Sequence, residues 1–246
     1  MPSSIDAAFA LDDLRMIREV RALDARRRYE EAEQAARTYT DPNLSAEGLE
    51  RRRAEMRDRA RAALAEDVAE LERTAARAAD TVRRAAAAAG QGPTDPSEAL
   101  LAEMRQSRAW DRARLLLESG RPVGEVIASA DLDTLRALRA ELPAYLTAQT
   151  ERPAGTEGES WTEVDTAAVA RTVEKTLADR LPGDQGAALR SRLELEAIEP
   201  GLTVTLAGLR RLADGVAVEG DGLRTAIEAR LADGAARATL PTAPAA

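Results

Sequence analysis

The sequence predicts an all-α protein, with a long helical hairpin or coiled coil followed by two small helical subdomains. Three observations lead to this fold class. Alanine, the strongest helix former, supplies much of the 44% apolar content, and aromatic residues make up only 2%. The charged residues, 32% of the chain, fall periodically between Leu, Ile, Val and Ala at helical spacing. Because alanine buries little surface, the expected body is thin and elongated rather than globular.

The first helix is predicted from about Ser4 to Tyr39, with the stretch Ser3 to Asp6 as an N-terminal cap. Its large apolar residues recur at spacings of four, seven, four and three, and others widen the stripe. This pattern predicts a face that is well buried on one side. Beyond Leu23 the stripe changes phase and thins to alanine and tyrosine. The stripe consists of Ile5, Phe9, Met16, Val20 and Leu23, widened by Leu11, Leu14 and Ile17.

The second helix is predicted from Leu49 to Ala89, after a break at Pro42 and a cap at Ser45. Together with the first helix it makes residues 1–90 a long antiparallel hairpin or one strand of an oligomeric coiled coil. The sequence leaves open whether this region folds back on itself or pairs between chains. A homo-oligomer is expected, and its predicted self-association seam is Met56, Ala60, Leu64, Val68, Leu71, Ala75, Ala78 and Val82.

Residues 97–148 form the densest apolar region and are predicted to be a small helical subdomain that follows a Gly/Pro-rich linker. The third helix of the chain is expected to start at Ser97, and Asp131 is expected to cap a later helix. Trp110 is interpreted as a packing or interface anchor, because tryptophan often dominates the energetics of contact surfaces. The predicted partner-docking residues are Trp110, Leu135, Leu138, Leu142 and Tyr145.

The last third of the chain is predicted to hold a flexible linker at 149–160, a helical subdomain at 161–236 and a disordered tail at 237–246. Residues 202–218 are ambiguous. Leu202, Val204 and Leu206 alternate as in a strand, whereas Leu202, Leu206 and Leu209 fit a helix, which we favour from about Thr205.

Six arginines lie between Arg51 and Arg61, in a chain whose net charge is −8. They point in different directions around a helix, and acids stand three or four residues from several of them. From Glu47 to Arg84, ten arginines face nine acids. The pattern therefore favours a solvated, ion-paired helix face over a nucleic-acid site, which stays open as an alternative.

The chain contains neither cysteine nor histidine. This excludes zinc sites built on those residues, iron–sulfur clusters, Ser-His-Asp triads and Cys-His pairs. Lys175-Thr176 lacks the glycines of a phosphate loop, and no run of 18 apolar residues occurs. We therefore expect a non-enzyme with no cofactor, no metal and no membrane span, located in the cytoplasm or in a virion.

The stretch "RARLLLESGRPVGEVIASADLDTLRALRAELPAYL" (residues 112–146) follows an Arg/Ala/Glu-rich helical hairpin. In this order the chain resembles helical structural and assembly proteins of tailed phages from GC-rich hosts, such as scaffold-like or minor virion proteins. The resemblance implies a role in head or virion assembly, with a coat or portal protein as partner. Scaffold proteins commonly end in a basic helix, whereas residues 223–238 here are mixed in charge. A cytosolic coiled-coil adaptor is the alternative.

Overall fold

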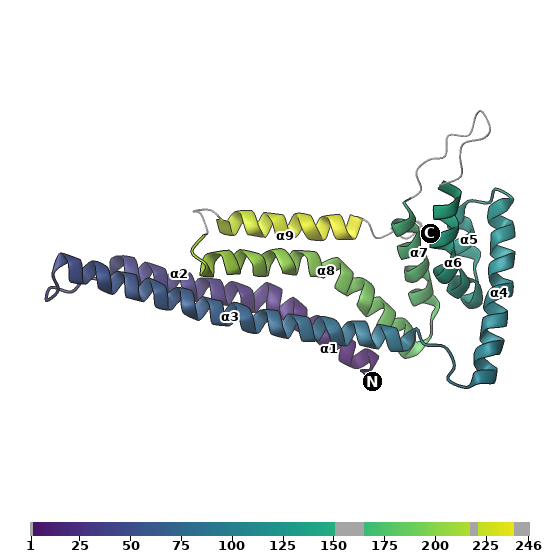
Figure 1. The fold of residues 1–246 in the computed structure, drawn as a ribbon, viewed down its shortest axis with the longest axis horizontal. Helices are drawn as coiled ribbons and strands as arrows, with labels where there is room; N and C mark the ends of the chain where they lie inside the picture. The colour runs from purple at the N-terminus through teal and green to yellow at the C-terminus, as the bar shows by residue number, and fades with distance from the viewer. Residues whose placement is uncertain (1, 151–164, 217–220, 239–246) are drawn as a thin grey trace, which may run out of the picture.

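The computed structural model describes residues 2–150, 165–216 and 221–238. All regular secondary structure in these ranges is helical, which confirms the predicted fold class. The molecule is elongated, with a long helical bundle at one end and a cluster of shorter helices at the other (Figure 1). Most of the predicted linker at 149–160, Trp161, and most of the predicted tail lie outside the described residues.

The first predicted helix is present as three consecutive segments: α1 (Ser4–Met16), a π-helical turn η1 (Ile17–Arg21) and α2 (Ala22–Thr38). The expected cap forms. The Asp6 backbone N–H donates to the Ser3 hydroxyl, and the Ser3 backbone N–H donates to the Asp6 carboxylate. A π turn inserts one residue into the helical repeat. The change of phase in the apolar pattern therefore has a local cause in η1, which the sequence alone did not reveal.

Helix α3 (Ala46–Ala89) is 44 residues long, about 66 Å at 1.5 Å per residue, and starts at the predicted cap Ser45. It folds back along α2, η1 and α1, and α8 (Gly183–Ala213) lies along the same bundle (Figure 1). The predicted seam is therefore occupied within the chain. Met56 is half-buried and Ala60 is buried, and the seam residues from Leu64 to Val82 are buried in one core with α1, α2 and α8. Its assignment as a self-association surface was wrong, because its neighbours are helices of the same chain.

The prediction of which side of α1 is buried was partly wrong. Leu11, Leu14 and Ile17 are buried as predicted, together with Ala7 and Ala10, and all five are at most 6% exposed. The remaining residues of the predicted stripe are instead between 41% and 68% exposed: Ile5, Phe9, Met16, Val20 and Leu23. Alanine at two of the core positions lets the helix backbones approach closely.

A second core lies at the other end of the molecule, among α4 (Pro96–Glu118), α5 (Val123–Ser129), α6 (Leu132–Thr150) and α7 (Thr166–Arg180). Helix α4 begins one residue before the predicted Ser97, because the Asp95 carboxylate caps it by accepting from the N–H groups of Ser97 and Glu98. The predicted cap at Asp131 is confirmed, since its carboxylate accepts the Thr134 N–H at 2.8 Å.

Helix α8 belongs to both cores, so residues 161–236 do not form the separate subdomain that was predicted. Leu189 and Leu193 contribute to the second core, whereas Leu195 and Leu202 contribute to the first. The helix is continuous through Pro200 and the ambiguous stretch as far as Ala213, which agrees with the helical alternative. It bends along its length (Figure 1), as expected for an internal proline, which removes a backbone hydrogen bond.

Helix α9 (Asp221–Ala238) packs on the outer side of α8 (Figure 1). Two glycines of α8 allow this close approach. A Cβ on Gly201 would overlap the Asp233 carboxylate, and one on Gly208 would lie 2.8 Å from the Thr225 hydroxyl. Asp233 is only 4% exposed and forms an ion pair with Arg18 of η1. This pair ties α9 to the first segment of the chain.

Candidate docking site

The residues predicted to dock a partner are mostly inside the second core. Leu135, Leu138 and Leu142 of α6 are at most 1% exposed. Trp110 of α4 and Tyr145 of α6 are half-buried, and their rings meet edge to face with centroids 5.6 Å apart. Such a pair stabilises helix packing. The assignment of the three buried leucines to a partner surface was therefore wrong, and Trp110 and Tyr145 contact each other between α4 and α6.

The opposite side of α4 is the better candidate. Helix α4 lies at the outer end of the molecule, away from the long bundle (Figure 1). Its buried residues are two alanines, Ala109 and Ala113. Five of its large apolar side chains are between 36% and 62% exposed: Leu100, Leu101, Met104, Leu115 and Leu116. We call this set the α4 face. The sequence pattern named several of these residues but assigned them to the subdomain core.

A cleft of about 740 Å³ adjoins the α4 face. It lies where the α3–α4 connection, α4, α6, α7 and α8 meet, with Leu177, Leu181 and Leu189 among its apolar lining residues. Its charged lining consists of three arginines and two acids: Arg105, Arg136, Arg139, Glu98 and Asp133. The cleft therefore carries a slight excess of positive charge within an acidic chain.

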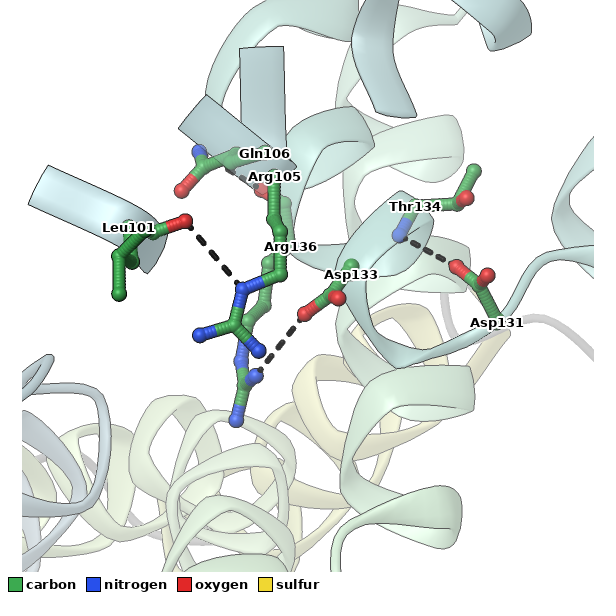
Figure 2. Close-up of polar contacts among 7 residues, drawn as sticks. All are labelled: Leu101, Arg105, Gln106, Asp131, Asp133, Thr134 and Arg136. Atoms are coloured by element: carbon green, nitrogen blue, oxygen red, sulfur yellow. Dashed lines mark hydrogen bonds and ion pairs between the residues drawn. The ribbon is translucent and has the colours of Figure 1, made fainter. Parts of the chain in front are cut away.

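Figure 2 shows how two of the cleft arginines, Arg105 and Arg136, are held. The Arg105 Nε donates to the Leu101 carbonyl oxygen at 3.2 Å, which places its guanidinium beside the α4 face. Arg136 pairs with Asp133 at 3.4 Å, and the Gln106 amide donates to the Arg136 carbonyl oxygen at 3.5 Å. Arg105 forms no ion pair within the described ranges. Its terminal nitrogens can therefore meet an incoming acceptor.

The back of the cleft is braced by a carboxylate on α7. Glu174, whose side chain is 18% exposed, pairs with Arg139 of α6 at 3.3 Å and with Arg192 of α8. One turn further along α8, partial burial raises the pKa of Glu196, an effect that Arg192 opposes. This network joins three helices by charge and fixes Arg139 at the cleft wall.

The arginine run of α3 is engaged with its own helix. Arg51 pairs with Glu47 at 3.1 Å, Arg52 with Glu55 at 3.0 Å, and Arg53 with Glu50 at 2.7 Å. The Arg53 guanidinium also donates to the Tyr39 carbonyl oxygen at the end of α2, at 2.9 and 3.1 Å. These contacts favour the ion-paired helix face over a nucleic-acid surface.

Across the described parts of the chain, no group of three or more acidic residues is placed to hold a metal ion. No helix in these parts is both long and apolar enough to cross a membrane. Comparisons with protein-family models, curated proteins and solved structures gave no match. The functional argument therefore rests on surface chemistry.

Proposed function

We propose that this protein is a non-catalytic assembly protein that acts through helix-mediated self-association and through docking of a partner on the α4 face. The observation that carries the proposal is the distribution of apolar side chains. Alanines fill much of the bundle core, while leucine, methionine, isoleucine and phenylalanine stand on outer helix faces. Contiguous exposed apolar residues are typical of interaction surfaces.

The α4 face combines apolar contact area with a guanidinium at its edge. Leu101 and Met104 are 55% and 45% exposed, and Arg105 lies beside them at the mouth of the cleft. Arginine at the rim of an apolar patch suits a partner helix that carries apolar residues and a carboxylate. The proposed partner segment is therefore an amphipathic helix with an acidic edge.

The resemblance to tailed-phage assembly proteins extends this proposal to a coat or portal protein as the partner. An elongated helical body with a docking face at its end suits a protein that sets the distance between larger components of an assembly or joins them. The adaptor alternative makes the same use of the α4 face with a different partner. The absence of histidine and cysteine supports a non-catalytic role.

Site-directed photo-crosslinking tests the docking face. A photoreactive amino acid replaces Leu101 in one variant and Glu47, at the far end of the bundle, in a control. Both are expressed where the chain is naturally made, and crosslinked partners are identified by mass spectrometry. We expect a discrete partner at position 101 that is absent at position 47. Equal products at both positions, or none at 101, would contradict docking through α4.

Mutation of the same face gives a quantitative check. Leu101→Glu combined with Met104→Glu should abolish co-purification of that partner, because two carboxylates replace its apolar contacts. The matched control is Arg51→Glu, an exposed charge change on α3. Recovery of a coat or portal protein would support the virion role, whereas a host cytosolic protein would support the adaptor role.

A further inference from the structure

The outer side of α1 and η1 carries a second exposed apolar surface, which we call the α1 stripe: Ile5, Phe9, Met16 and Val20. The steps of four and seven residues from Ile5 to Met16 are those of neighbours on one helix side. The π turn then changes the register, and Leu23 of α2 shares a surface hollow with α8 and α9 instead. From Ile5 to Val20 the stripe extends about 22 Å at 1.5 Å per residue. The inner side of the same helix is already buried against α3 and α8. Apolar residues on both sides mean that α1 is built to contact a second element.

Two charged residues beside the stripe have no partner within the described ranges. Neither Asp13 nor Arg21 forms a hydrogen bond or ion pair there, and both are exposed. Other charges nearby are engaged, since Arg15 pairs with Asp12 and Glu194, and Arg18 with Asp233. One carboxylate and one guanidinium are therefore left free beside an uncovered apolar stripe.

Asp13 and Arg21 lie on the same flank of the stripe. Arg15 points to α8, where it pairs with Glu194, and Asp13 stands two residues earlier, about 200° around the helix. Asp13 therefore lies on the flank that faces away from α8, toward α3. Arg21 shares a surface hollow with Asp67, Glu70 and Leu71 of α3, which places it on that flank as well.

We propose that two copies of this chain pair antiparallel through their α1 stripes, with Asp13 of each copy facing Arg21 of the other. In an antiparallel helix pair, same-flank residues meet across the interface, and a twofold axis makes every contact reciprocal. The axis then passes midway between positions 13 and 21, at the level of position 17. Met16 and Val20 of the two copies meet near the axis.

This inference rests on the proposed self-association and assigns it to a surface other than the α3 seam. The charge pattern selects the antiparallel orientation. The segment from Asp6 to Asp13 contains three acids and no arginine, whereas the segment from Arg15 to Arg28 contains six arginines and two acids. Antiparallel pairing sets the acidic half of each stripe against the basic half of the other, whereas parallel pairing would set like charges together.

Cysteine crosslinking of the full chain tests the geometry directly, because the natural chain contains no cysteine. In the proposed pair, residues 16 of the two copies are offset by about 3 Å along the helices, and residues 9 by about 24 Å. A disulfide needs Cα atoms about 4.4–6.8 Å apart. Met16→Cys should therefore crosslink to itself under mild oxidation, and Phe9→Cys should not.

Charge exchange tests the pairing energetically. Sedimentation equilibrium should show a concentration-dependent dimer, weakened about tenfold in Kd by Asp13→Arg or Arg21→Asp, because each substitution alters both reciprocal ion pairs. The double variant with both changes should restore the wild-type Kd. Leu44→Ala, an exposed apolar truncation in the turn between α2 and α3, is the control and should leave the Kd unchanged.

The results of these experiments distinguish pairing through the α1 stripe from the broader proposal of self-association. A chain that stays monomeric at all concentrations would overturn both the α1 pairing and self-association. An oligomer that persists unchanged in Asp13→Arg and in Phe9→Ala would overturn only the α1 pairing. Equal self-crosslinking of Met16→Cys and Phe9→Cys would indicate parallel helices and would refute the antiparallel arrangement.

Discussion

Replacing Gly201 by alanine tests whether the close approach of α9 to α8 holds the C-terminal helix in place. The new Cβ would overlap the Asp233 carboxylate and lie 2.9 Å from the Ala229 carbonyl oxygen. Asp233 is buried and paired with Arg18, so it cannot move aside without breaking that pair. The expected result is displacement of α9 and a less stable protein.

The magnitude follows from comparison with a second glycine. A Cβ on Gly234, also in α9, meets nothing within 4 Å, so Gly234→Ala should gain the helix-propensity difference of about 1 kcal/mol. Gly201→Ala has the same propensity gain but adds an overpacking cost of about 1–3 kcal/mol. The two variants should therefore differ by about 1–3 kcal/mol in free energy of unfolding, or about 2–12 °C in Tm for a chain of this size.

Thermal and urea unfolding followed by circular dichroism measure this difference, and hydrogen exchange locates it. Gly201→Ala should raise exchange in α9 selectively, while Gly234→Ala should not. If both variants proved equally stable, or if Gly201→Ala were the more stable, the tight contact between α8 and α9 would not exist as described.

Two further predictions concern the two cores. Leu64, which is 2% exposed, packs within the chain, so Leu64→Ala should lower the free energy of unfolding by about 2–5 kcal/mol in urea titrations. The same variant should leave the mass of any oligomer unchanged. Dissociation of an oligomer without loss of stability would instead support self-association through the α3 seam. Asp131→Ala should cost about 1 kcal/mol at neutral pH through loss of the α6 cap. Hydrogen bonds from the Thr134 hydroxyl and N–H lower the pKa of Asp131, so this contribution is present at neutral pH and is lost as pH falls through the lowered pKa. Asp131→Asn keeps the cap but cannot titrate, so its stability should be close to that of the wild type at neutral pH and should not show this loss in acid. Equal losses of stability at pH 7 in Asp131→Ala and Asp131→Asn would refute the capping argument.

The helices themselves could be read from periodicity and caps. Ser3, Ser45 and Asp131 each cap the helix that the pattern assigned to them. The end of α3 at Ala89, before Gly90, could be predicted in the same way. Local rules suffice here because capping involves residues no more than three or four positions apart.

The choice of buried face could not be read in the same way. In α1 all the large apolar residues were assigned to one buried side, and Leu11, Leu14 and Ile17 are buried, but Ile5, Phe9 and Met16 are exposed. Ala7 and Ala10 complete the core side, and alanine gave no signal because it also occurs on exposed helix faces. The π turn at Ile17 also shifts the register, and no sequence signal marks it.

The sequence did not predict the α4 face and the cleft as the candidate docking site. Trp110 and Tyr145 were assigned to a partner because aromatic residues often anchor interfaces, yet their edge-to-face contact is with each other. The cleft is assembled from α4, α6, α7 and α8, which are separated widely in sequence. Only the tertiary arrangement brings Arg105, Arg136 and Arg139 together.

The shared helix α8 limits where this chain can change in length. Removing one residue between Leu193 and Leu195 would rotate everything beyond it by about 100° and shift it by about 1.5 Å. One core or the other would then face the wrong side chains. Insertions and deletions should therefore accumulate at the turn between α2 and α3 and in the α3–α4 connection, whereas the residue count across the middle of α8 should be invariant among any natural variants of this protein.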